Sequence, residues 1–262
     1  MTVVTEQSGV WLYAVARDLD GRWLARVTGV DGEPVRTVHW GELAAIVGSV
    51  SLREYGEQAL RRNFEDLDWL GEKARAHDTV VHAAVRAGTT VPLRFATVCL
   101  DDRRVRSLLA ERRLDFEAAL ARVAGRAEWG VKGYADPDVP TQSRRSGSRE
   151  NARMGAGAAY LSRRHAELSA KEDRERQAAA FADDAHVSLM RLAVAGRRHP
   201  AQHRLLSGTR DWMVLNGTYL VEDDRADEFA AMVDELVDER GSTRIELTGP
   251  WPPYSFTGID GR

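Results

Sequence analysis

The chain has 262 residues, of which 43% are hydrophobic, and this size predicts two globular domains, each with its own core. Its formal net charge is -3 with 29% charged residues, so positive and negative groups nearly cancel and no basic field holds a phosphate backbone; we expect no nucleic acid partner. Cys99 is the single cysteine, which excludes an internal disulfide and a CxxC metal or redox motif and is typical of a reducing cytosol.

The N-terminus, Met1 to Gly9, has neither the basic start nor the apolar run of a signal peptide. No stretch of the sequence approaches the roughly 18 consecutive apolar residues that a membrane helix requires. The sequence therefore predicts a cytoplasmic protein without a membrane span.

Residues 1–126 read as an N-terminal α+β domain with a small mixed sheet and long helices. Apolar runs rich in β-forming residues predict its strands at 10–16, 35–40, 43–50 and 91–100. From Glu57 to Arg86 apolar residues recur at spacings of three, four and seven, which predicts one long helix that covers the sheet. Gly88 ends that helix, Asp101 begins a second helix, and Gly125 stops it at the domain boundary.

Residues 127–248 form the second predicted domain, in the order βαββαβ. Its expected elements are a strand at 128–134, a helix at 155–196, strands at 203–206 and 212–221, a helix at 224–240 and a strand at 242–248. This order is that of a ferredoxin-like fold, here modified by an unusually long first helix. A mobile loop is expected at 135–153, and the charged run Lys171 to Arg176 is expected on a solvated face or paired with another helix.

The sequence LTGPWPPYSF leads into an extended C-terminal tail, residues 249–262. Gly249 and the three prolines exclude a helix and a central strand. Each of the rings of Trp251, Tyr254 and Phe256 could remove about 150–250 Å² from water, so they should lie on the body of the protein or on a partner. These three are the candidate partner-binding residues. The alternative is that they lock the tail across the two domains.

The histidines show no metal-binding pattern. His77 and His82 are five residues apart on a helix, which turns them about 140° from each other, whereas the zinc-binding helix motif needs a separation of four. His77 falls near the apolar stripe, and a hydrogen-bonded histidine at the edge of the core is the favoured interpretation. We expect no metal and no cofactor.

Arg94 is the charged residue most in need of a partner, because strand alternation places it opposite apolar neighbours. Glu65, Asp66 and Asp68 are candidates, and a structural ion pair is favoured over a catalytic arginine. The sequence has no G-x-S-x-G elbow, no Walker loop and no G-x-G-x-x-G turn after a strand. It therefore predicts no enzyme and no small-molecule substrate.

The sequence LTGPWPPYSF closely resembles the C-terminal signature of the gas vesicle proteins GvpF and GvpL. Further blocks resemble this family in the expected order over nearly the whole chain: a strand with Tyr13, the strand 43–50, a helix with His77, VPLRFATV with Arg94, EWGVKGY and AAYLSRR. One departure is Ala96, where similar sequences tend to carry glycine after the Arg-Phe pair. A methyl group at that position implies that any close backbone contact has been relaxed.

The resemblance implies a two-domain α+β accessory protein of gas vesicle formation. Such a protein would bind the shell protein GvpA and other accessory gas vesicle proteins during assembly, or be a minor component of the vesicle, and no chemistry is implied. It would be found in the cytoplasm and at the gas vesicle. The resemblance leaves open the F or L type, the surface that binds the shell protein, retention in the mature vesicle and the oligomeric state. The alternative is a two-domain ligand-binding regulator or enzyme unrelated to gas vesicles.

Overall fold

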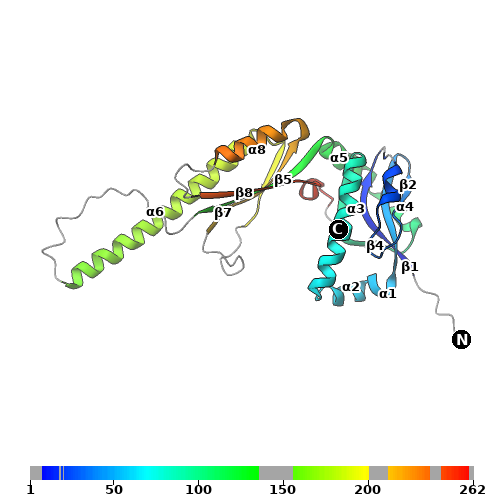
Figure 1. The fold of residues 1–262 in the computed structure, drawn as a ribbon, viewed down its shortest axis with the longest axis horizontal. Coiled ribbons are helices and arrows are strands. Elements are labelled where there is room, and N and C mark those ends of the chain that lie inside the picture. Colours follow the sequence, from blue (N-terminus) through cyan, green and yellow to red (C-terminus); the bar gives the residue numbers. More distant parts are fainter. Residues whose placement is uncertain are drawn as a thin grey trace. The chain divides into compact units, whose positions relative to one another are not determined.

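The computed structural model describes residues 8–17, 19, 21–135, 156–200, 212–236 and 243–259. The chain forms two compact units, and each is drawn in Figure 1. The N-terminal unit comprises residues 1–128 together with 250–262, and the second unit comprises residues 129–249. The C-terminal tail therefore belongs to the same compact unit as the first half of the chain.

The N-terminal unit is built on a four-stranded sheet with the order β2-β3-β1-β4. Its strands are β1 (Ser8–Ala16), β2 (Arg36–Trp40), β3 (Leu43–Ser51) and β4 (Thr90–Cys99). All pairings are antiparallel, so the α+β class is confirmed while the sheet is antiparallel rather than mixed. The reason is topological: β3 and β4 run in the same direction, but β1 lies between them.

Helices cover both faces of this sheet. They are η1 (Gly21–Arg26), α1 (Leu52–Tyr55), α2 (Glu57–Asn63), α3 (Leu67–Ala87), α4 (Asp102–Glu111) and α5 (Arg113–Val123). Alternation along β1 sends Leu12 into one core with α4 and α5, and Trp11 into another core with α1, α2 and α3. The unit therefore has two hydrophobic layers, one on each side of the sheet.

The single helix expected over Glu57 to Arg86 is two helices, α2 and α3. The break lies at Phe64 to Asp66, where the Asp66 carboxylate accepts hydrogen bonds from the backbone N–H groups of Asp68 and Trp69. This side chain caps the start of α3 and favours a new helix over a continuous one. Asp101 caps α4 in the same way, and the helix that it begins also divides, at Arg112.

The second unit has the ferredoxin-like order that the sequence predicts. Its elements are β5 (Arg126–Ala135, which begins in the N-terminal unit), α6 (Ala156–Met190), β6 (Ala195–Arg198), β7 (Trp212–Glu222), η3 (Asp223–Arg225), α8 (Ala226–Glu235) and β8 (Thr243–Trp251). The strand order is β6-β7-β5-β8, the interleaving of the split βαβ. The second strand occurs at Ala195–Arg198, where the sequence predicts the end of a helix. The strand expected at 203–206 and nearly all of the loop expected at 135–153 lie outside the described residues.

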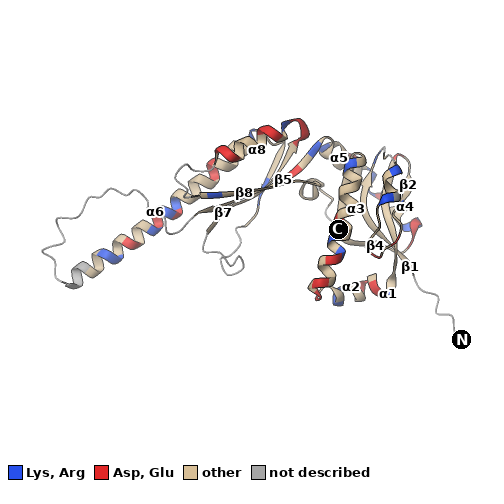
Figure 2. Cartoon of the chain, viewed as in Figure 1, with Lys and Arg blue, Asp and Glu red and all other residues tan. Residues whose placement is uncertain are grey.

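Only the second half of α6 packs on its sheet. Ala182, Ala185 and Leu189 are buried there, whereas the described side chains from Tyr160 to Leu168 are exposed, and α6 extends beyond the sheet in Figure 1. Figure 2 shows that both signs of charge alternate along the helix, and ion pairs join Arg164 to Glu167 and Lys171 to Glu175. Such exposed pairs contribute only about 0.3–0.5 kcal/mol each.

The two halves of α6 are expected to differ in local stability. Without a packed face, the backbone hydrogen bonds of residues 160–176 should open far more readily than those of residues 180–190. Hydrogen–deuterium exchange with mass spectrometry should show exchange at least about tenfold faster in the first segment. Equal protection of both segments in the isolated protein would contradict this expectation.

Candidate functional site

The C-terminal tail is anchored into the N-terminal unit. It forms a short helical turn, η4 (Tyr254–Phe256), in which the backbone N–H and the hydroxyl of Ser255 donate to the two carboxylate oxygens of Glu128 at 2.7 and 2.6 Å. The guanidinium of Arg122 donates to the Phe256 carbonyl at 3.3 Å. Phe256 is only 3% exposed, and Ile259 joins the core beneath α4 and α5. The tail therefore completes this core.

Two tail aromatics remain at the surface, beside α3. Trp251 is 46% exposed and Tyr254 is 36% exposed. The Trp251 ring stands edge-on to His82 with 5.8 Å between ring centroids, and His82 lies 3.3 Å from the Asp78 carboxylate. Burial and the neighbouring Asp78 raise the pKa of Tyr254 above its ordinary value. We call Trp251, Tyr254, His82 and Asp78 the tail patch.

The structure thus separates the three aromatics that sequence reasoning grouped together. Trp251 and Tyr254 are exposed enough to contact a partner in this conformation, while Phe256 becomes accessible only if the tail detaches from the N-terminal unit. That the tail rings bind a partner stays a prediction.

Arg94 lies in a wide bulge of β4. Leu12 pairs with Thr97 and Ala14 pairs with Pro92, so residues 93–96 of β4 stand opposite Tyr13 alone. The Thr97 hydroxyl donates to the Arg94 carbonyl at 2.7 Å across this bulge. The Arg94 side chain is exposed, and its assignment to a structural ion pair stays a prediction. Strand alternation could not have revealed the bulge, because the sequence 91–95 alternates regularly.

The bulge places Phe95 in a buried aromatic cluster around Trp11 and His77. Phe95 lies 5.1 Å from Trp11 and 5.6 Å from His77 between ring centroids. Trp11 Nε1 donates to His77 Nδ1 at 3.0 Å, and His77 is 3% exposed. Burial lowers the pKa of His77 to about 4, and the Leu93 carbonyl opposes this shift only in part. His77 is therefore a neutral, hydrogen-bonded core histidine, in agreement with its position near the apolar stripe.

Ala96 is the non-glycine residue with a positive φ in the described part of the chain, at 62°. Its Cβ is strained in this left-handed conformation by about 1–2 kcal/mol, a cost that glycine would not carry. The resemblance noted from the sequence leads us to expect glycine at this position. The finding gives that departure a physical meaning: the constraint is the backbone conformation.

Ala96→Gly is expected to raise the free energy of unfolding by about 0.5–1 kcal/mol. The substitution removes the strain of the left-handed conformation, and part of this gain is lost because glycine increases the conformational entropy of the unfolded chain. Ala110→Gly in α4, where φ is negative, should instead lower it by a similar amount. Urea unfolding of both variants measures whether each substitution raises or lowers the free energy of unfolding. A loss of stability with Ala96→Gly would refute the strain assignment.

A second polar network joins the loop before β2 to β1 and α1. The Tyr13 hydroxyl donates to Glu33 at 2.7 Å and accepts from the Val30 N–H at 2.8 Å, while the Tyr55 hydroxyl donates to the Val30 carbonyl at 3.2 Å. A side chain at Gly48 would overlap the Glu33 carboxylate. Burial is the main cause that raises the pKa of Tyr13, and the neighbouring Glu33 raises it further. Because these groups satisfy one another, we regard the network as structural.

Within the described residues, no group of three or more His, Cys, Asp or Glu side chains is arranged to hold a metal ion. None of the described helices has the length and apolar character needed to cross a membrane.

Comparisons with known proteins give a consistent result. The family described as gas vesicle synthesis protein GvpL/GvpF matches residues 9–258. Gas vesicle protein L of Streptomyces sp. (strain CB03234) is 44% identical over 95% of this chain and 92% of its own length, and gas vesicle protein F of the same strain is 28% identical over 94% and 98%. The crystal structure of GvpF from Anabaena sp. PCC7120 has the same fold, with a TM-score of 0.69 at 20% identity over 97% of this chain and 98% of that one. The chain belongs to the GvpL/GvpF family of gas vesicle synthesis proteins, and its role is related to gas vesicles.

Proposed function

We propose that this protein is an assembly factor that binds the shell protein GvpA and other accessory gas vesicle proteins during vesicle formation, and that it can remain as a minor component of the vesicle. The family match over residues 9–258 carries this proposal. The match favours this role over that of a regulator or enzyme unrelated to gas vesicles. The proposal assigns no catalytic step to the chain.

The physical task would be to cover apolar surface. A shell subunit exposes apolar surface before it polymerises, and a partner that covers this surface prevents aggregation and favours ordered addition. The tail patch offers two partly exposed aromatic rings that lie beside α3, and aromatic rings of this kind dominate binding energy at protein interfaces.

The chain is proposed to be of the L type. Its identity to protein L of Streptomyces sp. (strain CB03234) is 44%, against 28% to protein F of the same strain, over nearly equal shares of the chain. The expected consequence is that an L-deficient gas vesicle cluster from such a strain is complemented by this chain and an F-deficient cluster is not.

Co-expression with GvpA tests the binding directly. Size-exclusion chromatography with light scattering on the soluble fraction should reveal a defined complex of the two proteins. Trp251→Ala should weaken this complex at least about tenfold, while Leu114→Ala, another exposed apolar residue of the same unit, should leave it unchanged. If GvpA stays insoluble and this protein elutes alone, direct binding is refuted.

A further inference from the structure

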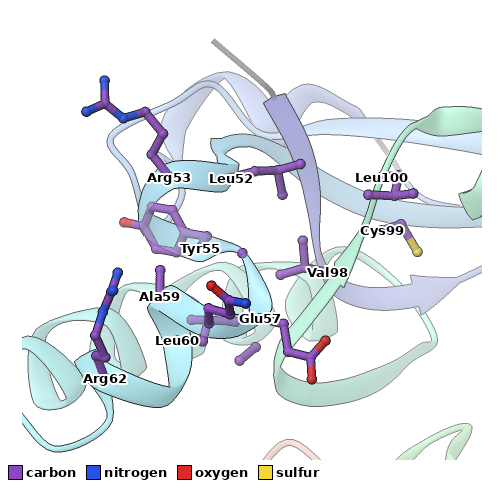
Figure 3. Close-up of a pocket in the computed structure, with 13 residues that line it drawn as sticks. Leu52, Arg53, Tyr55, Glu57, Ala59, Leu60, Arg62, Val98, Cys99 and Leu100 are labelled. Carbon is purple, nitrogen blue, oxygen red and sulfur yellow. The ribbon is translucent and has the colours of Figure 1, made fainter.

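A groove with a volume of about 780 Å³ runs between α1–α2 and the end of β4. Figure 3 shows Leu52 and Leu60 on the helical side and Val98 and Leu100 on the strand side. Leu100 is 71% exposed. Leu52 and Val98 are partly exposed and Leu60 is 8% exposed, so the part of the apolar lining that is open to solvent comes mainly from Leu52, Val98 and Leu100.

This groove follows the outer edge of the sheet. Among the described strands, β4 pairs with β1 alone. Val98 packs in the core that contains Trp11, on one face of the sheet. Its neighbour Cys99 packs against the core that contains Leu12, on the other face. Since both residues line the groove, it reaches the backbone edge between the two layers. An outer strand edge is the template on which an extended segment of another protein adds as a further strand.

Uncompensated positive charge stands on the groove wall. Arg53 and Arg62 line it, their side chains are exposed, and neither forms an ion pair within the described residues. The acidic side chain in the lining, Glu57, is held by Arg61 at 2.7 Å. A ligand with a carboxylate would complement the two guanidinium groups.

We propose that the α2–β4 groove, defined by Leu52, Arg53, Leu60, Arg62 and Val98, binds an extended, apolar segment of the shell subunit that carries an acidic side chain. The segment lies as an added strand beside residues 97–99 of β4, beyond the bulge. Its apolar side chains contact the leucines and Val98, and its carboxylate meets the two arginines. This inference rests on the proposed function, because the shell subunit supplies the segment.

Cys99 provides a probe that needs no mutation. It is the chain's single cysteine, it lines the groove, and it is partly exposed. Burial raises the pKa of its thiol, so alkylation by iodoacetamide is slow enough to follow by mass spectrometry. In the co-expressed complex with GvpA, the alkylation rate should fall at least about tenfold relative to the free protein, because the bound segment covers the strand edge.

Charge reversal tests the arginines. Arg53→Glu combined with Arg62→Glu should weaken the complex with GvpA at least about tenfold, while the melting temperature of the free protein stays within a few degrees, since both residues are exposed. The matched control reverses two exposed arginines of α4, Arg103→Glu with Arg106→Glu, and should leave binding unchanged.

The outcomes separate the two proposals. If the unmodified chain forms no complex with GvpA, the proposed function fails, and the groove proposal fails with it. If the complex forms, but Cys99 reacts as in the free protein and the Arg53/Arg62 variant binds normally, the groove proposal alone is overturned and GvpA docks elsewhere.

Discussion

Acidification from pH 6.5 to pH 4 is expected to lower the free energy of unfolding by about 3 kcal/mol through His77 alone. The folded-state pKa is about 4, against an ordinary value of 6.5, and each pKa unit corresponds to about 1.36 kcal/mol. As the pH falls below 6.5 the unfolded chain takes up a proton at His77, whereas the folded chain takes it up only near pH 4. The unfolded state binds more protons in this window, so stability decreases as the pH falls.

The hydrogen bond from Trp11 explains why the folded protein resists this proton. The N–H at Trp11 Nε1 points at His77 Nδ1, which must carry a lone pair to accept it. Protonation places a hydrogen on Nδ1, so two donors would face each other inside an aromatic cluster. The imidazolium would also lose its hydration, because His77 is surrounded by Trp11, Tyr13 and Phe95.

Urea unfolding between pH 4 and 7.5 measures the effect. Carboxylates also titrate over part of this range, so the informative quantity is the difference between the unmodified chain and His77→Gln, which cannot be protonated. That difference should change by about 3 kcal/mol across the window. His39→Gln, at an exposed position on β2, is the control and should follow the unmodified chain. A His77→Gln variant with the original pH dependence would contradict the assignment.

Phe256→Ala is expected to lower the free energy of unfolding by about 3–5 kcal/mol. The Phe256 ring is buried in the N-terminal unit. The backbone carbonyl of Phe256 accepts a hydrogen bond from Arg122, and the backbone N–H of the preceding Ser255 donates to Glu128. Removing the ring leaves a cavity and loosens the seat of the tail. Phe256→Leu, which keeps most of the apolar volume, should cost less than about 1.5 kcal/mol.

Trp251→Ala is the matched comparison within the same tail. The ring is 46% exposed, so its truncation should cost less than about 1 kcal/mol. Chemical unfolding of the three variants therefore orders them by burial. If Phe256→Ala were as mild as Trp251→Ala, the tail would not be part of the core in solution.

Much of the second unit follows from sequence pattern, because each element is local. The βαββαβ order emerges from apolar periodicity and glycine stops, and the strand order then agrees with the ferredoxin-like fold. The apolar stripe continues through the helix break before α3 and conceals it, although Asp66 is of a residue type favoured at helix N-caps. Competition between a cap and a continuous helix is decided by packing, which a single sequence does not display.

The tail shows the limit more clearly. Three prolines and three aromatics were sufficient to predict an extended segment whose rings need a surface. Its anchor, Glu128, lies 127 residues away in the chain from Ser255, and nothing in the local sequence marks the pair. The same holds for Trp11 and His77, which are 66 residues apart. Long-range polar partners of this kind appear only once the chain is folded.

The most direct test of the assembly role is vesicle formation in a host that carries a gas vesicle gene cluster lacking only the gene for this chain. Vesicles are expected to be lost, GvpA is expected to move from the soluble to the insoluble fraction, and the unmodified chain should reverse both changes. Vesicles in normal number, with GvpA distributed as before, would show that assembly proceeds without this protein and would contradict the account.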